Sequence, residues 1–197
     1  MAWSGYVYVY SPLTAYMIAR TCYCSSNCAS CSGTHSSGFS ALGFCCPVDV
    51  GGGGTPSGTN VKFYASAEIG SIETQRQTGF CLANPPAPYE DAVIVYLYRY
   101  ANAECFIGKL FYGHLSNRVS NGIYNRTQYQ GMTIGKTLAC CQDCYGGVHT
   151  HMGRDTVGAT QAYSCCANLT QGSSWIYRWY WQDGPCPAIP LPGNGKK

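Results

Sequence analysis

The sequence contains few charged residues. Only 11% of its 197 residues are Asp, Glu, Lys or Arg, and the formal net charge is +3. The basic residues are spread along the chain and form no cluster of the kind that binds a phosphate backbone. This distribution argues against a nucleic acid as partner.

Long apolar runs are also absent from the sequence. No stretch approaches the roughly 18 consecutive apolar residues of a membrane helix, so we expect no membrane span. The first residues, Met1 to Ser4, lack the basic and apolar regions of a signal peptide. We expect either that a leader has been removed or that the numbering starts late.

Helical periodicity is nearly missing, whereas short β-branched and aromatic runs bounded by Gly, Pro, Asn and Ser recur throughout. This pattern predicts an all-β fold with mostly antiparallel sheets. The expected strands are Gly5–Tyr10, Val61–Tyr64, Ile69–Glu73, Ala92–Tyr100, Ile107–Tyr112, Thr133–Leu138, Val148–Met152 and Ser174–Trp181.

Cysteine is abundant, with 14 residues. An even number at this density is typical of disulfides in an oxidising compartment, so we expect an extracellular, secreted protein. Structural zinc is the alternative, but the second half of a zinc knuckle is missing. The pairing cannot be read from the sequence. The cysteines are Cys22, Cys24, Cys28, Cys31, Cys45, Cys46, Cys81, Cys105, Cys140, Cys141, Cys144, Cys165, Cys166 and Cys186.

The remaining surface must be rich in hydroxyl, amide and aromatic groups, since Tyr supplies 17 residues and Gly 24. Such a surface suits self-association, an extracellular matrix partner or a glycan. Two sequons, at Asn125 and Asn168, predict N-glycosylation in surface loops.

Three of the four histidines fall in two short motifs. His114 follows an apolar strand in Tyr112-Gly113-His114-Leu115, and His149 and His151 form a His-x-His pair. In a strand, alternate residues point to the same face about 7 Å apart, so one imidazole can bind a metal while the other meets substrate or water.

The order of motifs resembles the lysostaphin-type zinc metallopeptidases. Val48-Asp49, Gly58-Thr59-Asn60-Val61, Tyr112-Gly113-His114-Leu115, Gly131-Met132-Thr133-Ile134-Gly135 and His149-Thr150-His151 follow one another as the family's motifs do. The sequence is also similar to the secreted animal branch containing leukocyte cell-derived chemotaxin. The resemblance spans roughly residues 40 to 155 and implies a lysostaphin-type β scaffold over 41–155. It does not explain the flanking segments, which we expect to be an N-terminal strand and Cys-rich stapled loop over 1–40 and an aromatic strand with a Pro/Gly tail over 156–197.

The resemblance also implies roles for individual residues. Asp49 and His151 match metal ligands, while His114 and His149 match the residues that orient the attacking water and stabilise the oxyanion. The chemistry would be attack of zinc-activated water on a peptide carbonyl. Cys45 occupies the position of the family's first ligand histidine. A Cys45 thiolate could bind zinc, and a loop rearrangement could bring in His35 instead, but we expect Cys45 to form a disulfide.

We therefore expect a secreted, peptidase-like module without catalytic activity that binds an extracellular partner or assembles into fibres, and that requires no cofactor. The first alternative is a zinc metalloendopeptidase that cleaves peptidoglycan-type or Gly-rich peptides. The second alternative is a glycan-binding domain that stacks sugars on its Tyr and Trp surface.

Overall fold

The computed structural model describes residues 3–13, 19–22, 44–51, 54–77, 91–138, 148–155 and 175–186, without the side chains of 19–22 and 45–47. Within these ranges the fold is mostly antiparallel β, which confirms the predicted class. All eight expected strands are present, with ends shifted by a few residues. Four strands were not predicted: β2 (Ala19–Cys22), β3 (Cys45–Gly51), β8 (Leu115–Ser116) and β9 (Gly122–Asn125).

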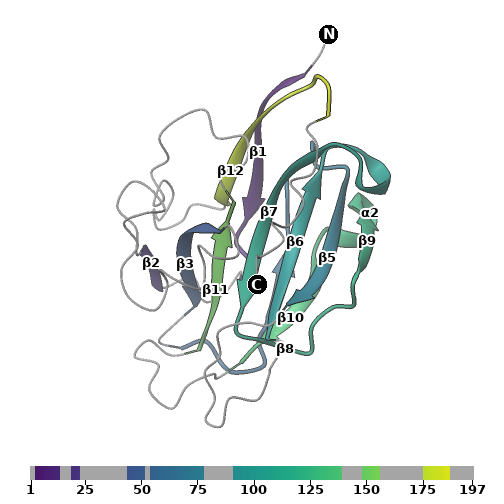
Figure 1. Ribbon diagram of the computed structural model, residues 1–197. Helices are drawn as coiled ribbons and strands as arrows, with labels where there is room; N and C mark the ends of the chain where they lie inside the picture. The colour runs from purple at the N-terminus through teal and green to yellow at the C-terminus, as the bar shows by residue number, and fades with distance from the viewer. Residues whose placement is uncertain are drawn as a thin grey trace, which may run out of the picture.

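The largest sheet has seven strands. Figure 1 shows its order from β2 through β3, β11, β7, β6 and β5 to β9, with β2 on the left of the view. Every neighbouring pair is antiparallel. The strands not yet given bounds are β11 (His149–Arg154), β7 (Phe106–Gly113), β6 (Ala92–Tyr98) and β5 (Ser71–Gln77).

Two smaller sheets accompany the large one. A three-stranded sheet has the order β4 (Asn60–Phe63), β10 (Met132–Thr137) and β8, and a ribbon pairs β1 (Ser4–Tyr10) with β12 (Trp175–Gln182). The ribbon lies at the top of Figure 1. Helical structure in the described residues consists of the short α2 (Arg126–Tyr129) and η3 (Ala101–Ala103), and no helix there is long and apolar enough to cross a membrane.

The two faces of the large sheet differ. Successive strand residues point to opposite faces, and in β6 Val93, Val95 and Leu97 belong to the main core, whereas Ala92 and Ile94 belong to a second, smaller cluster. The main core also contains Val7 and Val9 from β1, Trp179 from β12, Phe63 from β4 and Ile134 from β10. The two smaller sheets therefore cover one face. The second cluster, which includes Phe44 and Phe111, marks the other face.

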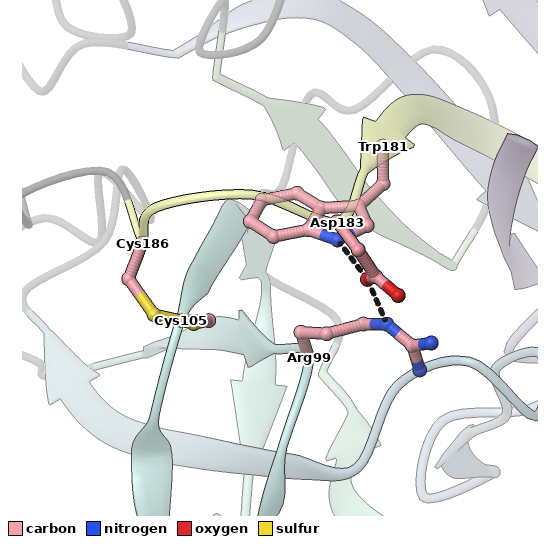
Figure 2. Close-up of a disulfide and its surroundings, with 5 residues drawn as sticks. All are labelled: Arg99, Cys105, Trp181, Asp183 and Cys186. Atoms are coloured by element: carbon pink, nitrogen blue, oxygen red, sulfur yellow. Dashed lines mark hydrogen bonds and ion pairs between the residues drawn. A yellow bond between two sulfur atoms is a disulfide. The ribbon is translucent and has the colours of Figure 1, made fainter. Parts of the chain in front are cut away.

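A disulfide fixes the end of β12. Cys186 is bonded to Cys105, which precedes β7, across 81 positions of sequence. Figure 2 shows Asp183 close by, accepting hydrogen bonds from Arg99 at 3.0 Å and from the Trp181 indole at 3.1 Å. The hydrogen bond from Arg99 holds the pKa of Asp183 below its usual value. Covalent and polar contacts thus tie the C-terminal strand to the large sheet.

Of the predicted disulfide cysteines, only Cys105 and Cys186 have described side chains. Cys22, Cys45 and Cys46 lie in described strands without described side chains, and Cys24, Cys28, Cys31, Cys81, Cys140, Cys141, Cys144, Cys165 and Cys166 lie outside the described residues, as does Asn168. That these cysteines form disulfides stays a prediction.

Candidate metal site

The second face of the large sheet carries the His-x-His pair. In β11, Thr150 and Met152 are buried and Met152 belongs to the main core, so His149 and His151 point to the opposite face. The neighbouring strand β3 alternates in the same way, with Val48 and Val50 in the main core. The register places Asp49 directly opposite His151. This pairing brings together residues about one hundred positions apart in the sequence.

Phe111 and Gly113 of β7 lie on the same face. Gly113 is opposite His151 in the β11–β7 register, and a Cβ atom added at Gly113 would lie 3.6 Å from the His151 Cβ and 2.8 Å from the Phe111 ring. A larger residue at this position would displace the Phe111 ring. Nothing in the sequence singled out Gly113 beyond its membership of the motif.

His114 stands where the chain leaves the large sheet for the three-stranded one, between β7 and β8. Its φ is +60°, in the left-handed region that residues with a side chain seldom adopt. Hydrogen bonds hold the peptide unit that joins His114 to Leu115, because Leu115 N donates to Asp91 O at 2.8 Å and Leu138 N donates to His114 O at 2.9 Å. Such backbone strain is often found at functional sites.

His114, His149 and His151 converge, and we call these three residues the histidine cluster. One potential ligand atom from each lies within 4.8 Å of the others. The His114 ring centroid is 5.0 Å from that of His149 and 5.9 Å from that of His151. The His151 side chain is 4% exposed, against 13% for His114 and 15% for His149. Solvent therefore reaches the cluster at His114 and His149.

Two carboxylates flank the cluster. Asp49 Oδ1 lies 2.6 Å from His151 Nδ1, a short hydrogen bond, and 3.6 Å from His149 Nε2. Asp91, buried just before β6, places Oδ2 at 3.7 Å from His114 Nδ1, which is ion-pair distance and longer than a hydrogen bond. Asp91 was not among the predicted site residues, and its only signal in the sequence is its position immediately before the apolar run of β6.

The donor set fits zinc. Imidazole nitrogen is a standard zinc ligand, and histidine ligands usually direct their second ring nitrogen at a carboxylate or carbonyl. Here Asp49 and Asp91 supply carboxylates to two of the three rings. Ligand atoms up to 4.8 Å apart are somewhat farther apart than the roughly 3.4 Å of tetrahedral zinc, a difference that side-chain rotation can close.

The other predicted site residues lie elsewhere. The backbone of Cys45 is in β3, opposite Arg154 and not opposite His151, and its side chain is not described. Asn125 is the exposed N-cap of α2, and its Oδ1 accepts hydrogen bonds from Thr127 Oγ1 at 2.7 Å and Gln128 N at 3.2 Å. Its predicted glycosylation is therefore accompanied by a structural role that the sequon alone did not indicate.

Comparisons of the chain with models of protein families, with curated proteins and with solved structures find no match. The function is therefore inferred from the geometry of the site.

Proposed function

We propose that the protein is a zinc-dependent hydrolase with a lysostaphin-type scaffold, acting on peptide bonds between small residues such as glycine. The observation that carries the proposal is the convergence of three imidazoles, with ligand atoms within 4.8 Å, on a face that solvent reaches. Catalytic zinc sites typically have three protein ligands and leave one position open to water. The convergence of the three imidazoles therefore supports a catalytic protein more than the module without catalytic activity that we expected because of Cys45.

The order of strands supports the scaffold. The motif residues Asp49 and His151 face each other across β3 and β11. The motifs at 58–61 and 131–135 also meet, since Val61 is opposite Gly135 in the β4–β10 pair. Four of the family's motifs thus lie in two pairs of hydrogen-bonded strands, β3–β11 and β4–β10, as a shared architecture would require.

The residues of the site would divide the work of hydrolysis. Zinc, when bound, would lower the pKa of a water molecule and polarise the substrate carbonyl. The histidine cluster would hold the metal. Asp49 accepts a hydrogen bond from His151 and so fixes its ring. His114 and His149, the more exposed rings, would meet the substrate side of the site.

The Cys105–Cys186 disulfide supports an extracellular location, because disulfides persist in oxidising compartments. We propose in addition that the protein is secreted and that its remaining cysteines form disulfides.

A cleavage assay tests the proposal. Zinc-loaded protein is incubated with an oligoglycine peptide, and products are followed by mass spectrometry. We expect cleavage that falls by about 100-fold or more in His149→Ala, because this variant removes one of the three imidazoles that would hold the zinc, while the exposed control Asn125→Asp cleaves normally. Absence of cleavage by the zinc-loaded wild type, or full activity of His149→Ala, would overturn it.

A second candidate is a binding module without catalytic activity. The β1–β12 ribbon presents Tyr6 and Tyr180 directly opposite each other, 40% and 44% exposed, with rings 5.5 Å apart. The Arg178 guanidinium lies 4.5 Å from the Tyr6 ring and 5.4 Å from the Trp175 ring. Exposed aromatic rings of this kind suit a sugar or a second copy of the chain.

Sedimentation tests whether the binding module self-associates, and a glycan array tests whether it binds sugars. Self-association or sugar binding that is lost in a Tyr6→Ser, Tyr180→Ser double variant would support it. A strictly monomeric protein that binds no glycan would remove it.

A further inference from the structure

The resemblance implies Asp49 and His151 as metal ligands, with Cys45 at the position of the third, but the geometry points to a different set. We infer that His114, His149 and His151 hold the metal and that Asp49 and Asp91 are positioning residues. The inference builds on the proposed zinc function and names the ligands of the same site.

The distance between Asp49 and His151 argues that they do not share a metal. Two ligands bound to one tetrahedral zinc at about 2.0–2.2 Å lie roughly 3.4 Å apart. Asp49 Oδ1 and His151 Nδ1 are 2.6 Å apart, which is a hydrogen bond in which Nδ1–H donates to the carboxylate. With Nδ1 protonated, Nε2 is the nitrogen of His151 that can bind a metal.

Asp91 stands in a similar relation to His114. Its Oδ2 lies 3.7 Å from His114 Nδ1, and its carboxyl group is 1% exposed. A carboxylate in this position is the usual partner of the ring nitrogen that does not bind the metal. The backbone oxygen of Asp91 also accepts the Leu115 N–H, so one residue restrains both the ring of His114 and the chain beside it.

The register of β3 places Asp49, and not Cys45, opposite His151. The backbone of Cys45 is opposite Arg154, with a bulge between the two pairs. His114 approaches from β7, on the other side of β11, and its ring centroid is 5.9 Å from that of His151.

Cobalt substitution tests the ligand set without reference to activity. A thiolate ligand gives Co²⁺ an intense near-ultraviolet charge-transfer band, which a site made of three imidazoles lacks. We expect wild-type protein to bind one Co²⁺ with visible ligand-field bands and no thiolate band. Because the spectrum is read on the wild type, the result does not depend on whether a Cys45 variant folds.

Competition of a zinc chelator with the protein gives the affinities of matched variants. Substitution of a residue that orients a metal ligand typically costs about 10–100-fold in metal affinity. We expect a loss in that range for Asp91→Asn, and a loss larger than about 100-fold for His114→Ala, since a ligand is removed. Asp155→Asn removes a different buried carboxyl group and serves as the control, with wild-type affinity. Circular dichroism establishes that each variant is folded.

Each outcome bears on one claim. A thiolate band, or unchanged affinity in His114→Ala, overturns the ligand set and leaves the proposed hydrolase standing. A spectrum of three imidazoles in a protein that cleaves no peptide overturns the hydrolase and leaves the ligand set. Wild-type affinity in Asp91→Asn removes the positioning role of Asp91, and failure to bind either metal overturns both proposals.

Discussion

The indole Nε1 of Trp179 donates a hydrogen bond to Oδ1 of Asp155 at 3.2 Å, with both side chains buried. The Lys109 N–H donates to the other carboxylate oxygen at 2.9 Å. This arrangement joins three strands, because Trp179 is in β12, Lys109 is in β7 and Asp155 directly follows β11. It fastens the β1–β12 ribbon to the large sheet.

Stability should fall as pH rises through the titration of Asp155. Burial raises the pKa of Asp155 from 3.8 to about 6, although the hydrogen bond from Trp179 opposes the shift. The folded state therefore binds more protons than the unfolded state between pH 4 and 6, and its free energy of unfolding decreases with pH there. The difference between the two pKa values corresponds to about 3 kcal/mol of the free energy of unfolding, which is present below pH 4 and lost above pH 6.

Denaturant unfolding at pH 4.5 and 7.5 measures this contribution. Other groups titrate over the same range, so the comparison is with Asp155→Asn, which should show a smaller decrease between the two pH values. An equal decrease in the two proteins would contradict the prediction.

Loss of the Cys105–Cys186 disulfide should destabilise the protein. The bond closes a segment of 81 residues, and removal of a native disulfide typically costs about 2–5 kcal/mol. Thermal unfolding of the Cys105→Ser, Cys186→Ser double variant should show a lower midpoint, with far-ultraviolet circular dichroism retained below it. An unchanged midpoint would mean that the bond does not restrain the chain.

Gly108→Ala should be more damaging than an ordinary substitution of glycine. A Cβ atom at Gly108 would lie 2.3 Å from Trp179 Nε1 and would displace the indole from its hydrogen bond with Asp155. Overpacking of a core costs about 1–3 kcal/mol. Gly54→Ala is the matched control, since a Cβ atom there meets nothing within 4 Å. Equal unfolding midpoints for the two variants would show that Trp179 does not pack against Gly108.

Two variants of Asn125 separate capping from glycosylation. Asn125→Ala removes the N-cap of α2 and should lower the free energy of unfolding by about 1 kcal/mol. Asn125→Asp keeps a side-chain oxygen that can accept from Gln128 N, so its stability should stay near that of the wild type. Both variants destroy the sequon, so protein secreted from eukaryotic cells should lose the same glycan mass. Equal stability of the two would disprove the capping role.

The sequence predicted the strongly patterned parts of the fold. The apolar run of β6 and the aromatic run of β12 were found because burial on one or both faces leaves a clear hydrophobic signal. β3 was missed because its two buried valines surround a single Asp and follow Cys-Cys-Pro, which is too short an alternation to recognise. β8 has only two residues, and its pairing depends on the turn at His114.

The candidate site was predictable only in part. The order of motifs singled out four residues, and the structure places them together: Asp49, His114, His149 and His151. Asp91 could not be found, because it approaches His114 through the pairing of β6 with β7 and not through any sequence spacing. Disulfide pairing was equally inaccessible, since 14 cysteines allow very many combinations.

Calorimetric titration of metal-free protein with Zn²⁺ tests the central claim, that the histidine cluster is a metal site, most directly. We expect one zinc bound per chain in the wild type, and no binding at this site in a His149→Ala, His151→Ala double variant that retains the wild-type circular dichroism spectrum. A wild-type protein that binds no zinc, or a double variant that binds it as tightly as the wild type, would show that the histidine cluster is not a metal site.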